Sequence, residues 1–179
     1  MRVLIDACVL FPTVMREVVL GVAAQGLFEP RWSDRILEEW ARATPKLGSG
    51  AEAIARGEIA LLSARFPRSN VPAAPHVEQR LWLSDENDIH VLASAIAGSC
   101  DAILTINAKD FPKHVLAEEG LVRLDPDGFL YALWLDHPQQ VQAAADAVLA
   151  EARRLSADDW TMRSLMKKAR LPRLGKALG

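Results

Sequence analysis

Acidic side chains recur where apolar segments of this chain begin or end. Asp6 ends the apolar run "RVLID", Asp88 stands at the head of an apolar helical run, and Asp110 follows the run "DAILTIN". Either Glu38 or Glu39 joins them from a helical segment between these runs. The strands of an open α/β sheet end at one crevice, so acids that are far apart in sequence converge there. The pattern indicates a site built from carboxylates.

Carboxylates that are gathered at one point repel one another unless a cation lies among them. Hard oxygen ligands suit Mg²⁺ or Mn²⁺, and Mg²⁺ binds oxygen at about 2.0–2.1 Å. The chain has no paired Cys or His residues at the spacing of a zinc site. The residue types therefore favour magnesium or manganese over zinc.

Asp6, and Asp85 just before Asp88, each have a structural interpretation as well as a functional one, whereas Asp88 is less easily explained by structure alone. Asp6 is interpreted as a site residue, and a turn at the end of its strand is the alternative. Asp85 is interpreted equally well as a site residue or as a simple helix cap. Asp88 lies one turn before Val91, on the helix side that faces the sheet, where an acid without a partner is costly. We therefore expect Asp88 to have a partner.

Periodicity leaves other positions open. Glu38 and Glu39 lie on opposite margins of the apolar stripe of their helix, so the helical wheel does not choose between them. Asn107 and Asp110, in "NAKDFP", could equally be local turn residues. His90 is interpreted as a surface or packing histidine.

Short apolar runs alternate with helical patterns over residues 1–125, which is typical of α/β folds. The predicted strands are 2–6, part of 28–33, 101–107 and 121–125, and the predicted helices are 13–26, 34–44, 48–66 and 88–98. The proline-rich residues 68–79 are predicted as a loop with at most one edge strand. The order favours a doubly wound, mostly parallel sheet that is flanked by helices.

Beyond Pro126 the chain is predicted to be helical and becomes basic. From Arg153 onward it holds eight basic and two acidic residues, a charge of +6, which leaves −8 for the residues before it. We expect one domain at residues 1–136 and a basic helical extension at 137–179. The basic side chains are solvated helix faces, RNA contacts or a docking site for a partner protein.

The remaining composition bears on the cellular compartment. Cys8 and Cys100 lie beside apolar strand-like runs, which favours reduced thiols over a disulfide. Asp6 interrupts the first apolar run, so neither a signal peptide nor a membrane span is expected. These features favour a cytoplasmic protein.

Four segments, "VLIDACVL", "SDRILEEW", "DENDIHVLASAI" and "ILTINAKDFP", resemble in this order the motif regions of PIN-domain ribonucleases. The last segment is similar to the branch whose motif reads T-x-N-x-x-D-F-P. The resemblance covers about residues 1–125, and the ordered set is more specific than any single segment. The basic tail is similar to the C-terminal extension of some VapC-type toxins of bacterial type II toxin-antitoxin systems.

The resemblance implies a PIN-like α/β fold whose metal ligands and catalytic residues are Asp6, Glu39, Asp88 and Asp110. The resemblance selects Glu39 over Glu38, because Glu39 lies six residues after Ser33, which begins the motif helix.

Two further residues have implied supporting roles. Thr105 matches a hydroxyl near the metal or the scissile phosphate. The chain departs from the commonest family pattern at Asn107, where many members carry aspartate. The fourth ligand is therefore Asp110, the carbonyl of Asn107, or a water that either residue holds.

The implied function is that of a Mg²⁺- or Mn²⁺-dependent endoribonuclease that hydrolyses RNA phosphodiester bonds, such as those of tRNA or rRNA. A toxin of this kind implies a cognate antitoxin protein, and the family likeness implies a homodimer. The alternative is a non-catalytic PIN-like module that binds protein or RNA. A receiver domain and a haloacid-type phosphatase fit less well, because the former needs a lysine after a later strand and the latter needs D-x-D where this chain has Asp6-Ala7-Cys8.

Overall fold

The computed structural model describes residues 1–179. Spatial contacts group the chain into two compact units, and each unit is made from two segments. The first unit comprises residues 1–11 and 29–123, and the second comprises 12–28 and 124–179. The predicted division into 1–136 and 137–179 stays a prediction, because contacts within one structure do not test which parts fold alone.

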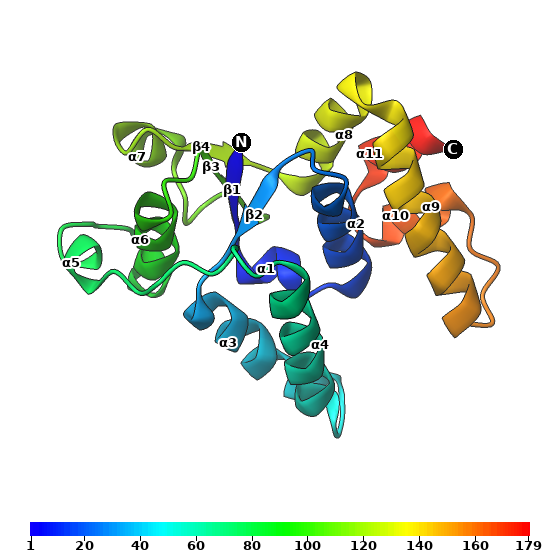
Figure 1. Cartoon of the computed structure of the whole chain (residues 1–179), viewed down its shortest axis with the longest axis horizontal. Coiled ribbons are helices and arrows are strands. Elements are labelled where there is room, and N and C mark those ends of the chain that lie inside the picture. Colours follow the sequence, from blue (N-terminus) through cyan, green and yellow to red (C-terminus); the bar gives the residue numbers. More distant parts are fainter. The chain divides into compact units, whose positions relative to one another are not determined.

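The first unit is built on a parallel four-stranded sheet in the order β2-β1-β3-β4, with helices around it (Figure 1). The strands are β1 (Arg2–Ile5), β2 (Glu29–Arg31), β3 (Ala102–Leu104) and β4 (Val122–Leu124). The helices are α1 (Ala7–Leu10), α3 (Asp34–Ala43), α4 (Ala51–Arg65), α5 (Pro75–Glu78), α6 (Ile89–Ala97) and α7 (Lys113–Glu118), with 3-10 turns η1 (Thr44–Leu47) and η2 (Glu86–Asp88). The predicted α/β class with a parallel sheet is confirmed.

The two central strands consist almost entirely of buried apolar side chains. Val3, Leu4 and Ile5 of β1 are fully buried, and so are the side chains of β3. Strands that are covered on both faces have such continuous apolar runs rather than an alternating pattern. Pro30 lies in β2 at one edge of the sheet, where a missing backbone donor is tolerated.

Helix α3 begins at a capping serine and carries the candidate glutamates. The Ser33 hydroxyl accepts a hydrogen bond from the Ile36 backbone N–H at 3.3 Å. The helix buries Ile36, Leu37 and Trp40, and it packs against α1 and α4. The amphipathic pattern predicted from the sequence therefore sets which face of α3 is buried.

Helix α6 is the most deeply buried helix near the site. Residues His90 to Ala95 are all buried, and the helix contacts β1, β3 and α5 (Figure 1). It begins after η2 and ends at Gly98, as the sequence predicted. A Cβ at Gly98 would lie 2.8 Å from a methyl of Val71, so this position requires glycine for close packing.

The prediction of a loop at residues 68–79 was wrong in part. Residues 75–78 form α5, which begins with Pro75 and packs against α6. Proline fits the first turn of a helix, since the N–H that it lacks would have no helical partner there. The short helices α1 and α7 were also not predicted, because six residues or fewer hold too little periodic pattern.

All the elements that lie wholly within the second unit are helices. It contains α2 (Thr13–Ala24), α8 (Pro126–Asp136), α9 (Pro138–Leu155), α10 (Met162–Lys168) and α11 (Pro172–Leu178). Helices α2 and α9 approach closely at Gly21, where a Cβ would lie 3.2 Å from that of Ala144. The Asp127 carboxylate accepts the backbone N–H groups of Arg173 and Leu174 at 2.9 Å each, which ties α8 to the first turn of α11. The helical prediction beyond Pro126 is thus confirmed as four separate helices.

Membrane-spanning length and apolarity are not found together in any helix of the chain.

Replacing Ser33 tests how far the cap supports α3. Ser33→Ala leaves an unpaired backbone N–H at a buried helix end, so we expect the free energy of unfolding to fall by about 1 kcal/mol. Urea unfolding followed by circular dichroism measures the change. Ser33→Thr retains a hydroxyl and should lose less, whereas equal losses in both variants would mean that the hydroxyl does not stabilise the helix.

Candidate metal centre

Asp6 and Thr105 directly follow the two central strands. The pairing of β1 with β3 ends with a hydrogen bond from the Asp6 backbone N–H to the Leu104 carbonyl at 3.1 Å, so residues 6 and 105 emerge side by side. The Thr105 hydroxyl donates to Asp6 Oδ2 at 2.7 Å, and the Cys8 thiol donates to the same oxygen at 3.0 Å. Asp6 is 6% exposed. Two donors therefore hold one oxygen of a buried carboxylate and leave Oδ1 without a hydrogen bond.

The thiol of Cys8 stays protonated in this environment. Its pKa is raised to about 12 by burial first, and then by the nearby Asp6 charge. A protonated thiol can keep donating to Asp6, whereas a thiolate would repel it. The sequence had indicated only a reduced thiol at this position and no contact with Asp6.

A second set of contacts leads from Thr105 to Asp110. The Asn107 backbone N–H donates to the Thr105 hydroxyl at 2.9 Å, and the Asn107 side-chain amide donates to Asp110 Oδ2. Asn107 thus bridges Thr105 and Asp110 through its two N–H groups. The side-chain carbonyl of Asn107 and Asp110 Oδ1 have no hydrogen-bond partner in the protein, so all three alternatives for the fourth ligand stay open.

Three aspartates form the tightest acid cluster. Each of Asp85, Asp88 and Asp110 offers a carboxylate oxygen, and these oxygens lie within 4.8 Å of one another. Asp85 also accepts hydrogen bonds from the backbone and side-chain N–H groups of Asn87 at 2.9 and 3.0 Å, as a cap does. Asp85 is therefore a cap that also lies near the two other aspartates. In the sequence, the signal for this proximity was the spacing of three residues between Asp85 and Asp88, which flank one 3-10 turn.

Glu39 contacts a buried histidine on a different helix. His90 Nε2 of α6 lies 2.7 Å from Glu39 Oε1 of α3, and His90 is 2% exposed. Arg35 lies 3.8 Å from the same oxygen. The sequence indicated a packing or surface role for His90, and the structure places it as a buried partner of Glu39. No pattern within α6 alone identifies that partner.

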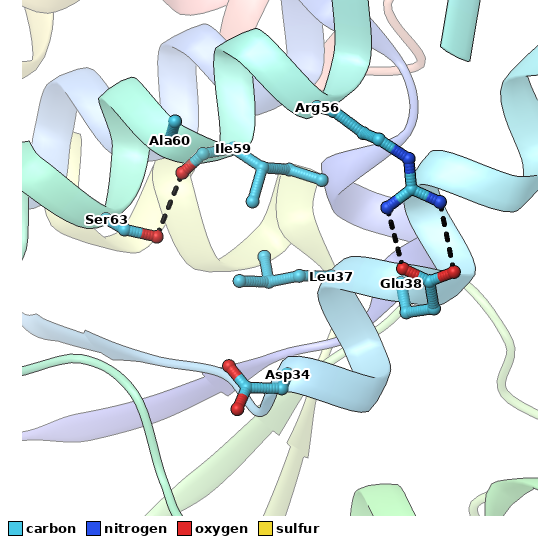
Figure 2. A pocket seen from close by; sticks show the side chains of 7 residues that line it. All are labelled: Asp34, Leu37, Glu38, Arg56, Ile59, Ala60 and Ser63. Atoms are coloured by element: carbon cyan, nitrogen blue, oxygen red, sulfur yellow. Dashed lines mark hydrogen bonds and ion pairs between the residues drawn. The ribbon is translucent and has the colours of Figure 1, made fainter. Parts of the chain in front are cut away.

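Glu38 faces arginines instead. Arg56 donates to its two oxygens at 2.8 and 3.1 Å, and Arg42 donates at 2.7 Å. These hydrogen bonds, first from Arg56 and then from Arg42, lower the pKa of Glu38 to about 2. Figure 2 shows the Arg56 guanidinium directed at the Glu38 carboxylate in the groove between α3 and α4. Glu38 is thus already neutralised by neighbouring side chains of the protein.

The groove in Figure 2 is separate from the acid cluster. It encloses about 280 Å³ and is lined by side chains of α3 and α4, namely Asp34, Leu37, Glu38, Arg56, Ile59, Ala60 and Ser63. Neither Glu39 nor any of the three clustered aspartates lines it. The groove therefore plays no part in the acid site.

The pKa of Asp88 is influenced by all the other acids of the site. Its pKa is raised from 3.8 to about 6, first by burial and then by the charges of Asp6, Asp110, Asp85 and Glu39, in that order. Asp88 thus experiences repulsion from each acid that the sequence analysis selected and from Asp85. A raised carboxylate pKa of this origin is typical of sites where a cation or a proton is required.

The donor set fits a hard divalent cation. In Asp6, Asp85, Asp110 and Glu39, one carboxylate oxygen contacts a protein group and the other has no hydrogen bond. Neither carboxylate oxygen of Asp88 accepts a hydrogen bond, and the pKa of this residue is raised. Oxygens that are oriented in this way can bind Mg²⁺ or Mn²⁺ without first breaking contacts with the protein.

The pKa of Asp88 predicts a pH dependence of stability in the metal-free protein. The pKa of Asp88 in the fold is above its ordinary value of 3.8. The protonated Asp88 carboxyl therefore favours the folded state. This contribution to stability is fully present below pH 3.8 and is lost as the pH rises through about 6. We expect chelator-treated Asp88→Asn to melt above the unmodified protein at about pH 7.5, and by less at about pH 5. Differential scanning calorimetry measures both. Asp136→Asn, which removes an exposed carboxylate from α8, should show no such pH-dependent gain.

Comparison with known proteins identifies the family. A family model described as "PIN domain" matches residues 2–109, which include Asp6, Glu39, Asp85 and Asp88 and end one residue before Asp110. No curated protein and no solved structure gives a significant match. Because the family model covers more than half of the chain, this chain belongs to the PIN domain family.

Proposed function

We propose that this chain is a metal-dependent endoribonuclease that hydrolyses RNA phosphodiester bonds. PIN domains are generally metal-dependent nucleases, and the chain has a cluster of acidic residues that fits metal binding. The observation that carries the proposal is the approach of the Asp85, Asp88 and Asp110 oxygens to within 4.8 Å inside such a domain. Without a cation, that arrangement raises the free energy of the fold through charge repulsion.

The proposed metal ligands and catalytic residues are Asp6, Glu39, Asp88 and Asp110, with Asp85 as an additional ligand. A bound Mg²⁺ or Mn²⁺ ion would supply an activated water nucleophile and neutralise charge on the attacked phosphate.

The remaining residues of the site orient these acids. Thr105 and Cys8 hold one oxygen of Asp6, so that the other is fixed in direction. Asn107 donates a hydrogen bond to Asp110, whereas His90 Nε2 lies 2.7 Å from Glu39 Oε1 without forming a hydrogen bond to it. The hydrogen bonds to Asp6 and Asp110 limit side-chain rotation, and the conformational entropy that metal binding costs is thereby reduced.

We further propose that the protein is the toxin of a cytoplasmic toxin-antitoxin pair, with a cognate antitoxin protein as its inhibitor. The similarity of the tail to VapC-type extensions supports this role. Arginines of an antitoxin would pair well with the acid cluster, since guanidinium and carboxylate groups form strong bidentate hydrogen bonds. Induced expression in a bacterial host, with and without Asp88→Asn, tests it: growth arrest by the unmodified chain alone supports the role, and equal growth of both opposes it.

Metal binding is expected to stabilise the fold. When the ion is present at 100 times its dissociation constant, the gain in unfolding free energy is about 2.7 kcal/mol. Thermal melts with Mg²⁺, Mn²⁺ and chelator measure this gain. It should disappear in Asp88→Asn and Asp110→Asn and persist in Glu38→Gln, whose carboxylate is held by arginines. A gain that persists in Asp85→Asn would remove Asp85 from the ligand set.

Cleavage of a mixed tRNA and rRNA pool tests the activity itself. We expect metal-dependent cutting that chelator abolishes and that falls by at least about 100-fold in Asp6→Asn, Glu39→Gln and Asp88→Asn, because direct ligands matter more than their supports. Glu38→Gln is the matched control on the same helix, and it should cut normally.

Two results would contradict the nuclease proposal. One is a folded, metal-loaded protein that cuts no RNA, and the other is cutting that the three substitutions leave unchanged. The first result favours a non-catalytic module that binds RNA or protein, and the second points to a contaminating nuclease.

A further inference from the structure

The last twenty residues carry positive charge without any acidic side chain. Residues 160–179 contain Arg163, Lys167, Lys168, Arg170, Arg173 and Lys176 and no Asp or Glu. They form α10, α11 and the turn between them, all inside the second unit. All six basic residues are exposed. This segment is called the basic face below.

Helical spacing places three of these charges on the exposed side of α10. Met162, Leu165 and Met166 are buried, whereas Arg163, Lys167 and Lys168 are exposed together with Ser164. In particular, Arg163 and Lys167 lie four residues apart on one side of α10, and Arg170 follows in the turn after the helix, where its backbone is left-handed. These three exposed cations, called the row below, follow one another along the chain from α10 into the turn.

The protein does not neutralise this row. No side chain of the basic face forms an ion pair with a carboxylate. Its two aromatic contacts place Lys168 4.6 Å from the ring centre of Trp160 and Arg173 4.1 Å from that of Tyr131. Arg154 of α9, by contrast, pairs with Glu151 at 2.7 Å. Like charges four residues apart, as in Arg163 and Lys167, destabilise a helix, so folding does not account for the row.

We propose that the basic face binds the phosphate backbone of single-stranded RNA. This inference rests on the proposed nuclease function and adds where the substrate is held. The acid cluster repels a polyanion, so a ribonuclease with this site requires cations elsewhere in the chain to bind RNA phosphates. An array of exposed cations supplies contacts to the backbone that are independent of base sequence.

The surface fits RNA better than an acidic protein partner. Stable protein interfaces have an apolar centre and are depleted in lysine. None of the large exposed apolar side chains of the chain lies in residues 156–179. Binding of a polyanion through exposed cations needs no such centre, because the cations neutralise phosphates directly.

The test is binding of a labelled, unstructured single-stranded RNA in the presence of chelator, which prevents cleavage. The variant is Arg163→Gln, Lys167→Gln and Arg170→Gln together. We expect its dissociation constant to rise by at least about tenfold. The slope of log affinity against log salt should become shallower by about 2, since each phosphate contact on a single strand contributes about 0.7.

A charge-matched control separates the basic face from net charge. Lys46→Gln, Arg65→Gln and Arg68→Gln remove three exposed cations from the first unit, and this variant should bind RNA nearly as the unmodified protein does. Thermal melting establishes that both variants are folded. Equal RNA binding by the two variants would overturn the proposal. Binding of polyglutamate is measured in parallel as an acidic polypeptide probe. If the basic-face variant loses affinity for polyglutamate but not for RNA, the surface binds an acidic polypeptide instead, and the proposal is overturned.

The outcome is independent of catalysis. Asp88→Asn removes a negative charge from the acid cluster, so it should bind RNA in chelator at least as tightly as the unmodified protein. If the nuclease proposal fails but the basic-face variant still loses RNA affinity, the surface remains an RNA-binding site of a non-catalytic protein. If cleavage is confirmed but RNA affinity is unchanged, the basic face is not the substrate contact.

Discussion

The hydrogen-bonded pairing of β1 with β3 determines where the acid site begins. Apart from Arg2, both strands are buried, so their relative register is set by packing on both faces as well as by the backbone ladder. That register places Asp6 beside Thr105, and the Thr105 hydroxyl is the first group to hold the Asp6 carboxylate. From Thr105 the contacts continue through Asn107 to Asp110. One strand pairing therefore positions two acids that are more than one hundred residues apart in the chain.

The acid cluster lowers the stability of the metal-free fold, because its carboxylates repel one another. The raised pKa of Asp88 is a consequence of the same repulsion and of burial. Burial and four neighbouring carboxylates all disfavour the charged form of this residue. The fold limits the cost by giving one oxygen of most of the acids a protein contact, including His90 for Glu39. It leaves Asp88 without such a contact. Sites that are strained in this way are common where function requires a group that folding alone would not select.

The contrast between Glu38 and Glu39 shows how the same residue type acquires different chemistry. Adjacent positions on a helix point about 100° apart, so the two carboxylates face different neighbours. Glu38 meets Arg42 and Arg56 and becomes part of a surface ion-pair network. Glu39 meets His90 and contributes to the field at Asp88. The basic face of the second unit is the opposite case, since its cations have no carboxylate partners at all.

The sequence by itself determined the buried strands, the start of a helix at Ser33 or Asp34, the end of another at Gly98, and the positions at which acids follow or precede apolar runs. These features are local, because strand burial, capping and helical spacing depend on residues within one element. Only the tertiary structure paired Glu39 with His90 and directed Glu38 toward arginines, and only it brought Asp110 to Asp85 and Asp88. Periodicity specifies the direction of a side chain relative to its own helix. It holds no information about which side chain of another element lies opposite, and that depends on how the elements pack.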